Sequence, residues 1–453
     1  MSGSGPPAGT AIALIDGEHY PDVTAAALRY AEEVMGYRLR ALVFLGGTEK
    51  LAEAGLPDFR GLPVYRGAGQ VEALRRALEE HRVDFVLDLS DEPVVGYRER
   101  FRMVSEALAM GVSYRGADFE FTAPARPYLC EKPCVGIWGS GKRVGKTAVS
   151  GYLARLLAAD GSSPCVLTMG RGGPPGPELL ASPERVTDEY LLGMVREGRH
   201  AASDHFEDAM MAGVAAVGTR RCGGGMAGEP FFSNVREGAL LACALECDIL
   251  LCEGSGAAIP PVGVDSVMLV VSAAQPHEYV LEYMGPYRLL LSDLVLVTMC
   301  EDFQVSSDKL RRLIDGIKSI NPGVKVVECV FRPRPLGDLE GDKVFLTSTA
   351  PGPAVEIQAS YLEEHYGATV AGSSSNLADR RRLEEDLRLP AAAEADVFVT
   401  ELKAAGVDTV SVFARSEGKR LVYMENIPVS PEVNLEEELG HLGSLARDRC
   451  RKR

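Results

Sequence analysis

The residues best placed to do chemistry lie in a glycine-rich segment about a third of the way along the chain. The segment Gly139–Thr147 reads Gly-Ser-Gly-Lys-Arg-Val-Gly-Lys-Thr, between an apolar run at Val135–Trp138 and a helical window at Ala148–Ala158. Such a strand–turn–helix lets backbone N–H groups converge on a phosphate at the helix N-terminus. Lys146 would neutralise phosphate charge, and the Thr147 hydroxyl would bind Mg²⁺. The predicted nucleotide-binding residues are Gly139, Ser140, Gly141, Lys142, Arg143, Val144, Gly145, Lys146, Thr147 and Ala148.

The spacing of this loop departs from the usual phosphate-binding pattern, G-x-x-x-x-G-K-[ST]. Ser140 stands where that pattern has its first glycine, and the nearest glycines are Gly139 and Gly141. A loop one residue longer, opening at Gly139, resembles the dethiobiotin synthetase group of P-loop proteins.

A magnesium-binding acid is predicted further along the chain, because a P-loop needs a carboxylate at the end of a nearby strand. The apolar run after Asp248 ends at Glu253, and Gly-Ser-Gly follows it. This Glu-Gly-x-Gly step also resembles the dethiobiotin synthetase group. Glu253 is therefore the predicted partner of Thr147, whereas Asp248 is predicted to be a turn or cap residue.

Two acidic residues four positions apart, Asp204 and Asp208, are predicted to share a helix face. Asp204 is a candidate third magnesium ligand, and a solvated acidic face is the alternative.

Three arginines are candidates for stabilising a transferred phosphoryl group. Arg171 follows the apolar run Cys165–Met169 in Gly170–Pro174, and the alternative is an exposed loop arginine. Arg220 and Arg221 fall in Gly218–Gly228, which we interpret as a mobile lid on a polyanion or as a surface loop.

The choice between ATP and GTP rests on the pattern Asn/Thr-Lys-x-Asp, which normally recognises guanine. No Asn/Thr-Lys-x-Asp follows the late apolar run that ends at Thr298, so ATP is expected rather than GTP.

Apolar runs alternate with amphipathic windows along most of the chain, which predicts an α/β fold with mainly parallel sheets. Residues 1–10 are expected to be a flexible start and 11–129 a Rossmann-like N-terminal domain without a G-x-G-x-x-G turn. Residues 130–345 are the predicted P-loop NTPase core. Residues 346–453 are a C-terminal α/β extension, either a separate domain or a continuation of the core sheet. Its basic end, Arg447–Arg453, is expected to be solvated.

The composition excludes several function classes. The chain has 453 residues and a formal charge of −16, which argues against nucleic-acid and anionic-membrane partners. Its apolar runs predict no transmembrane helix, and the first ten residues predict no secretory signal. The ten cysteines form no C-x-x-C pair and suit a reducing compartment, so a cytoplasmic protein is expected.

Taken together, these motifs resemble those of the cyclic 2,3-diphosphoglycerate synthetase family over nearly the whole chain. The opening Asp16-Gly-Glu-His-Tyr-Pro is the most specific of them. The others that match are the loop at 139–147, Gly170–Pro174, Ala201–Asp208, Glu253–Gly256 and Phe331–Pro335. The resemblance implies an ATP-dependent ligase that closes 2,3-diphosphoglycerate into an intramolecular phosphoanhydride and releases ADP and phosphate. A homodimer is expected, because related P-loop proteins often pair.

The substrate-binding residues predicted with this resemblance are Glu18, His19, Arg171, Arg332 and Arg334. His19 would approach the γ-phosphate across a cleft between the first two domains, or else stabilise a strand-end turn. Arg332 and Arg334 would point to one side of an extended segment, or else belong to a proline-stiffened linker. Two other functions stay open: another P-loop ligase or kinase acting on a small anion, and a ParA-like nucleotide-switched interaction protein.

Overall fold

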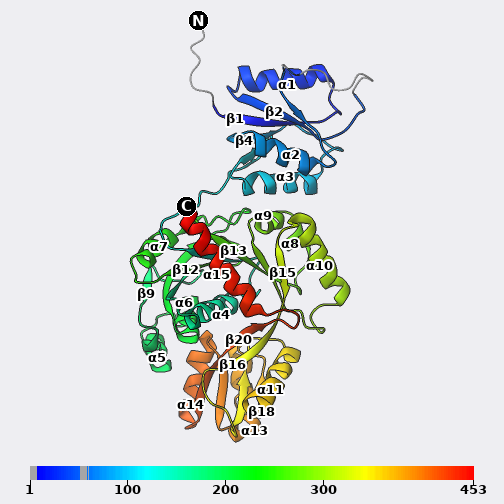
Figure 1. The fold of residues 1–453 in the computed structure, drawn as a ribbon. Coiled ribbons are helices and arrows are strands. Elements are labelled where there is room, and N and C mark those ends of the chain that lie inside the picture. Colours follow the sequence, from blue (N-terminus) through cyan, green and yellow to red (C-terminus); the bar gives the residue numbers. More distant parts are fainter. Residues whose placement is uncertain (1–7, 51–58, 60) are drawn as a thin grey trace. The chain divides into compact units, whose positions relative to one another are not determined.

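The computed structural model describes residues 8–50, 59 and 61–453 (Figure 1). Residues 1–7 of the predicted flexible start lie outside this part. The described chain divides into two compact units, which we treat separately. One unit runs to Ala125 and includes Pro276–Leu291 and Asp315–Pro322, and the other contains Arg126–Gln275, Ser292–Ile314 and Gly323–Arg453.

The first unit is built on a sheet with the strand order β3-β2-β1-β4-β5-β6. Its pairs are parallel except β5–β6, as the alternation of strands and helices predicts. Aliphatic and aromatic residues such as Ala11, Leu42 and Phe85 are buried and form its core. The elements are β1 Thr10–Ile15, α1 Pro21–Glu33, β2 Arg38–Phe44, β3 Val64–Tyr65, α2 Gln70–Glu80, β4 Phe85–Asp88, α3 Tyr97–Ala109, β5 Ser113–Arg115, β6 Glu120–Phe121, α8 Glu278–Leu281 and α9 Gly285–Leu290.

The second unit contains the P-loop core, whose sheet has the order β11-β10-β8-β12-β7-β13-β14-β15. The neighbours from β10 to β15 run parallel, so the carboxyl ends of β7, β8 and β12 meet at one edge. Its strands are β7 Cys134–Gly139, β8 Pro164–Gly170, β9 Glu178–Leu180, β10 Ala215–Cys222, β11 Phe232–Ser233, β12 Ile249–Glu253, β13 Ser266–Ser272, β14 Leu294–Thr298 and β15 Lys325–Glu328. The helices are α4 Lys146–Ala159, α5 Asp188–Arg196, α6 Asp204–Glu207, α7 Val235–Cys243 and α10 Ser307–Ile320.

The predicted lid at Gly218–Gly228 is wrong in its first half, because residues 215–222 form strand β10 beside β8. Gly218 occurs in this strand because the His205 ring packs against it. A Cβ atom built on Gly218 would lie 2.5 Å from His205 Nδ1. The glycine that suggested a loop therefore marks a close approach within a strand.

The C-terminal residues form a sheet of their own, with the order β16-β20-β19-β17-β18. These strands do not continue the core sheet, although they belong to the same compact unit as the P-loop core. The change of sheet falls between two neighbouring strands: β15 ends at Glu328, and β16 begins the new sheet at Val330. The elements are β16 Val330–Pro335, β17 Lys343–Thr347, α11 Gly352–Tyr366, β18 Thr369–Ser374, α12 Arg380–Asp386, α13 Pro390–Glu394, β19 Val397–Glu401, α14 Ser411–Ser416 and β20 Arg420–Val429.

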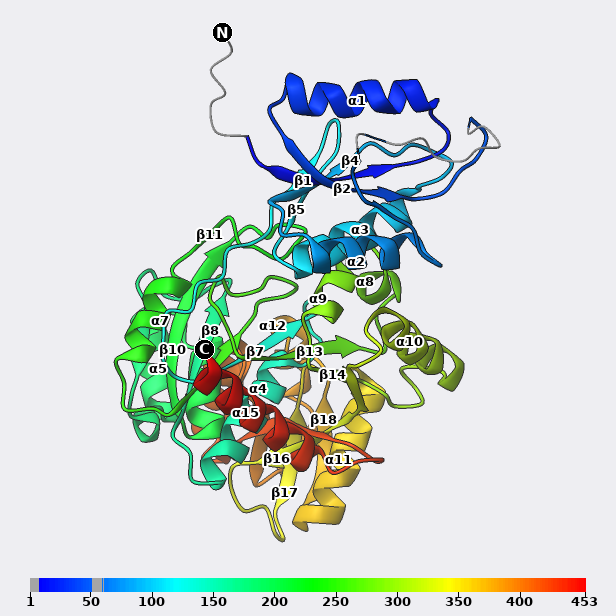
Figure 2. The ribbon, with the colours of Figure 1, turned by 45° about the horizontal axis from the view of Figure 1, so that its top comes forward.

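The last helix, α15 (Leu435–Lys452), returns to the P-loop core (Figures 1 and 2). Leu439 and Leu442 are buried in the same cluster as the phosphate-loop helix. The basic end is largely exposed, as the sequence predicts, and two of its arginines also form ion pairs. Arg449 pairs with Asp293 at 2.8 Å, and Arg453 pairs with Asp265 at 3.3 Å, because α15 lies across acidic residues at strand starts.

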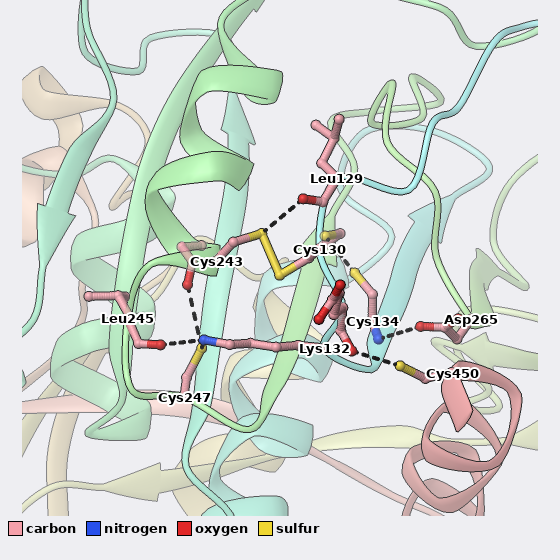
Figure 3. Close-up of a disulfide and its surroundings, with 12 residues drawn as sticks. Leu129, Cys130, Lys132, Cys134, Cys243, Leu245, Cys247, Asp265 and Cys450 are labelled. Carbon is pink, nitrogen blue, oxygen red and sulfur yellow. Dashed lines mark hydrogen bonds between the residues drawn. A yellow bond between two sulfur atoms is a disulfide. The ribbon is translucent and has the colours of Figure 1, made fainter. Parts of the chain in front are cut away.

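The cysteines were expected to suit a reducing compartment, and one pair of them differs from that expectation. Cys130 and Cys243 form a disulfide that ties the segment before β7 to the end of α7 (Figure 3). Cys165, Cys252 and Cys329 are buried thiols in apolar clusters, as their positions in apolar runs predict. Of the helices in the part that the structure describes, none is long and apolar enough to cross a membrane.

Candidate active site

The phosphate loop lies between β7 and α4, as its sequence predicts. Gly139 leaves room for the Lys146 side chain, since a Cβ atom there would lie 2.9 Å from Lys146 Nζ. Gly145 has a φ of 88°, in the left-handed region that favours glycine, and it forms the N-cap of α4. Lys146 Nζ donates a hydrogen bond to the Gly141 carbonyl at 2.9 Å, so the side chain lies across the loop that would surround a phosphate.

The predicted magnesium pair meets at the carboxyl end of β12. The Thr147 hydroxyl donates to Glu253 Oε1 at 2.8 Å. The other oxygen of Glu253, Oε2, is buried and has no hydrogen-bond partner among the described residues. A hydroxyl and an unsatisfied carboxylate oxygen are the hard oxygen ligands that Mg²⁺ prefers, so these residues fit the ion.

Burial shifts the pKa values of Glu253 and Lys146 in the directions that favour their neutral forms. It raises the pKa of Glu253 to about 8 and lowers the pKa of Lys146, each because desolvation penalises the charged form. The side chains are only 2% and 8% exposed, respectively. A bound cation beside Glu253 and a bound phosphate beside Lys146 would reverse both shifts.

A cavity of about 1170 Å³ opens at this edge of the core sheet, within the second unit. Its lining comes from the phosphate loop and from the C-terminal sheet. Lys146, Thr147, Arg171, Asp204 and Glu253 lie on the core side. Pockets for one small ligand usually measure about 300–1,000 Å³, so this cavity has room for a nucleotide and a second small molecule.

Two of the three candidate arginines converge beside this edge. A Cβ atom on Gly256 would lie 2.6 Å from Arg171 Nη2 and 3.5 Å from Arg221 Nη2, and Arg221 Nη2 donates to the Ser255 carbonyl at 2.7 Å. Side chains alternate along strand β10, so Arg220 is directed to the other face. There the Cβ atom of Arg220 lies beside Gly173, and neither Arg220 nor Arg221 is among the residues that line the cavity.

Asp204 and Asp208, which were predicted to share a helix face, lie in different surroundings. Asp204 lines the cavity with Glu207, and both lie close enough to Glu253 to raise its pKa. Glu207 Oε2 accepts a hydrogen bond from Lys403 of the C-terminal part at 2.6 Å. Asp208 is instead buried, and burial holds its pKa well above the ordinary value. The interpretation of a solvated acidic face is therefore wrong for Asp208.

Arg332 and Arg334 lie on β16, with their guanidinium groups engaged by carboxylates. Arg332 pairs with Glu301, and Arg334 pairs with Glu425 and donates to the Met211 carbonyl at 3.1 Å. The segment is a strand paired to β20 rather than a linker. Neither arginine is among the residues that line the cavity.

The two N-terminal candidates belong to the first unit. Asp16, 2% exposed, accepts hydrogen bonds from the backbone N–H of Glu18 at 3.0 Å and of His19 at 3.3 Å. His19 Nδ1 lies 2.9 Å from Asp16 Oδ1. The structure thus shows His19 in the strand-end turn that was one of its two interpretations.

Sequence reasoning missed the C-terminal side of the cavity. Glu401, Lys403, Gln358 and Asn426 all line it. Glu401 ends β19, which is parallel to β17, so the strand-end rule offered one signal. No motif marked the other three residues.

The comparisons with known proteins agree along the chain. Family models match residues 10–122 as the N-terminal domain, 134–330 as the P-loop domain and 335–427 as the C-terminal domain of cyclic 2,3-diphosphoglycerate synthetase. The chain belongs to the cyclic 2,3-diphosphoglycerate synthetase family. The resemblance expected from the opening motif and the loop is therefore confirmed.

Curated relatives of the same name cover almost the full chain. The synthetase of Rubrobacter xylanophilus is 48% identical over 96% of both chains. That of Thermococcus gammatolerans is 46% identical over 95% of this chain and 97% of its own. That of Methanothermobacter thermautotrophicus is 43% identical, covering 93% and 92%.

A solved structure, LpxK from Aquifex aeolicus in complex with ATP, matches 72% of this chain and 90% of its own at 13% identity. Its TM-score is 0.38, and no argument about the site rests on it.

Proposed function

We propose that this chain, an enzyme of the cyclic 2,3-diphosphoglycerate synthetase family, uses ATP to close 2,3-diphosphoglycerate into its cyclic phosphoanhydride. The observation that carries the proposal is the large cavity at the phosphate loop. It brings a P-loop lysine, an acid–hydroxyl pair and Arg171 to one space with room for two ligands. The substrate is a compact polyanion, so a site in an acidic protein needs such local positive charge.

The reaction is balanced as two substitutions at phosphorus. An oxygen of one substrate phosphate attacks the γ-phosphorus of ATP, the bond to the β–γ bridging oxygen breaks, and ADP leaves. An oxygen of the neighbouring substrate phosphate then attacks the phosphorus of the first substrate phosphate. The bond from that phosphorus to the oxygen that bridges it to the transferred phosphoryl group breaks, and inorganic phosphate leaves with the electron pair. The product holds one new P–O–P bond, and no side-chain nucleophile is consumed.

The protein contributes position and charge to both steps. Lys146 neutralises charge between the β- and γ-phosphates, and the residues from Gly139 to Ala148 surround the phosphates. Arg171 and Arg221, which meet at Gly256, stabilise the charge that develops on the transferred group. Glu18, His19, Arg332 and Arg334 are retained as candidate substrate ligands. To bind substrate, His19, Arg332 and Arg334 would first have to leave their present contacts with carboxylates.

Magnesium is included in the proposal because of the unsatisfied Glu253 oxygen beside Thr147. When bound, the ion would neutralise negative charge on the ATP phosphates. Thr147 and Glu253 would hold it, with Asp204 at the edge of the same cavity as a further candidate.

The proposal also covers the organisation of the protein. We propose a Rossmann-like domain at 11–129, a P-loop core at 130–345 and a C-terminal extension at 346–453, with two adjustments: the sheet of the extension begins at Val330, and α15 packs on the core. We also expect a cytoplasmic homodimer, by analogy with other P-loop proteins. Light scattering on the eluting peak of a sizing column measures the dimer directly.

Phosphorus NMR of the purified protein with ATP, Mg²⁺ and 2,3-diphosphoglycerate tests the function. The expected result is a pair of upfield phosphoanhydride resonances that grow in step with ADP and phosphate. Turnover only with another small anion would replace the substrate assignment. Slow ATP hydrolysis with no small-molecule product would support the nucleotide-switch alternative instead.

A further inference from the structure

A buried carboxylate organises the C-terminal side of the cavity. Glu401, 5% exposed, accepts hydrogen bonds from the Ser348 and Thr349 hydroxyls, each at 2.6 Å. It also accepts from Asn426 Nδ2 at 3.2 Å. The Asn426 amide thus lies with its nitrogen toward the Glu401 carboxyl oxygen, which accepts its hydrogen bond.

This orientation passes to a glutamine on the next element. With its nitrogen toward Glu401, Asn426 presents Oδ1 to Gln358 on helix α11, and Gln358 Nε2 donates to it at 2.7 Å. The Gln358 amide is thereby fixed as well, with its carbonyl oxygen as the free end. Flipping either amide would place two acceptors or two donors opposite each other, so the hydrogen bonds from Gln358 to Asn426 and from Asn426 to Glu401 fix both amides.

The free end is a buried acceptor. Gln358 is 5% exposed, and its Oε1 has no hydrogen-bond partner among the described residues. An unsatisfied buried acceptor costs about 1–3 kcal/mol, so a donor from a ligand would be favourable here. Gln358 lines the same cavity as Lys146 and Thr147.

Both apolar and polar side chains line the cavity together with Gln358. Ile357, Met424 and Phe331 are among the apolar ones, and Glu401 and Asn426 are among the polar ones. Phe331 also contacts the phosphate loop, since a Cβ atom on Gly145 would lie 2.3 Å from its ring. A fixed neutral acceptor suits an organic group that carries an N–H or O–H, and it suits an ionised phosphate poorly, because phosphate oxygens are acceptors too.

The two ligands of the proposed reaction differ in this respect. Ionised 2,3-diphosphoglycerate has a carboxylate and two phosphate esters, and it has no N–H or hydroxyl group. ATP has an amino group on its base and two ribose hydroxyls. On the basis of the proposed function, we propose that the C-terminal part of the chain binds the nucleoside end of ATP, with Gln358 Oε1 accepting a hydrogen bond from its amino group or a hydroxyl.

Calorimetric binding of nucleoside diphosphates tests this inference without turnover. Gln358→Leu and the volume-conserving Gln358→Met should weaken Mg²⁺-ADP binding about three- to tenfold, the value of one buried hydrogen bond. Gln70→Leu is the control, because Gln70 also has a buried free Oε1 but lies in the first unit. It should leave ADP affinity within twofold. Two variants guard against misfolding, and a thermal melt of each identifies folded protein.

The nucleotide series separates the two donors. If the amino group donates, the unmodified protein prefers ADP to inosine diphosphate, and both Gln358 variants lose that preference. If a ribose hydroxyl donates, the same loss appears with 2′-deoxy-ADP or 3′-deoxy-ADP. Unchanged ADP affinity in folded Gln358 variants would overturn the inference. Binding does not involve 2,3-diphosphoglycerate, so a failed phosphorus NMR experiment would reject the proposed function and leave this result to stand by itself.

Discussion

The two sides of the cavity are built in opposite ways. On the core side, the chemistry is concentrated in nine consecutive residues, Gly139–Thr147, which are recognisable from their order. On the C-terminal side, Gln358, Glu401 and Asn426 come from α11, β19 and β20 and meet only in the folded protein. A phosphate can be bound by backbone N–H groups of one turn, whereas a fixed side-chain acceptor needs partners from other elements. The comparison predicts that charge neutralisation and catalysis depend on the core side and nucleoside recognition on the other.

The largest expected effect is on the core side. Lys146→Ala should lower kcat on the order of 10³-fold, since a cation beside the transferred phosphoryl group is lost. Lys142→Ala, in the same loop but exposed, should cost less than tenfold. Steady-state ADP release with 2,3-diphosphoglycerate measures both. Equal effects of the two variants would mean that the loop acts only through its general charge.

The arginines offer the next test, since neighbours on one strand point to opposite faces. Arg171→Ala and Arg221→Ala should each lower kcat about 10²-fold with unchanged melting temperatures, the usual cost of one stabilising donor. Arg220→Ala is the matched control and should cost less than fivefold. If Arg220→Ala is the more damaging change, the geometry at Gly256 is not the one used in the reaction.

The buried carboxyl of Glu253 should make the stability of the protein depend on pH. The pKa of Glu253 is about 8 in the folded protein and 4.5 ordinarily, so the folded state binds the proton more tightly than the unfolded state does. The resulting contribution to the free energy of unfolding is fully present below about pH 4.5 and is lost as the pH rises toward 8. Glu253→Gln should therefore raise the melting temperature of the nucleotide-free protein by a few degrees at pH 8 and hardly at all at pH 5. Added Mg²⁺ should stabilise the unmodified protein more than this variant.

The smallest effect is expected at the contact between the two sides. Lys403 and Glu207 form a partly exposed ion pair, so solvent weakens their interaction. A double-mutant cycle with Lys403→Met and Glu207→Gln should give a coupling of about 1 kcal/mol in urea denaturation. A coupling near zero would mean that the C-terminal sheet is held to the core by its other contacts, such as the pair of Arg155 with Glu425.

Most of the fold could be predicted wherever the local pattern had one interpretation. The apolar runs at β7, β12 and β14 appear as strands within one or two residues of their predicted ends. The error at β10 arose because a local signal had a tertiary cause: Gly218 marks a contact with His205 rather than a loop. The ion pairs of Arg449 and Arg453 with distant acids, and the change of sheet between Glu328 and Val330, also leave no local pattern.

The sequence alone determined the phosphate loop, its acid and the family, because these depend on residue types in consecutive order. Backbone groups, Lys146 and Thr147 are brought together by one turn, and an apolar strand ends in Glu253 whatever lies beside it. Only the tertiary structure decided which of two adjacent arginines meets Arg171, and that Gln358 presents a free oxygen. Those outcomes depend on strand pairing and on hydrogen bonds between residues 25 and 68 positions apart in the chain, and such contacts leave no local pattern in the sequence.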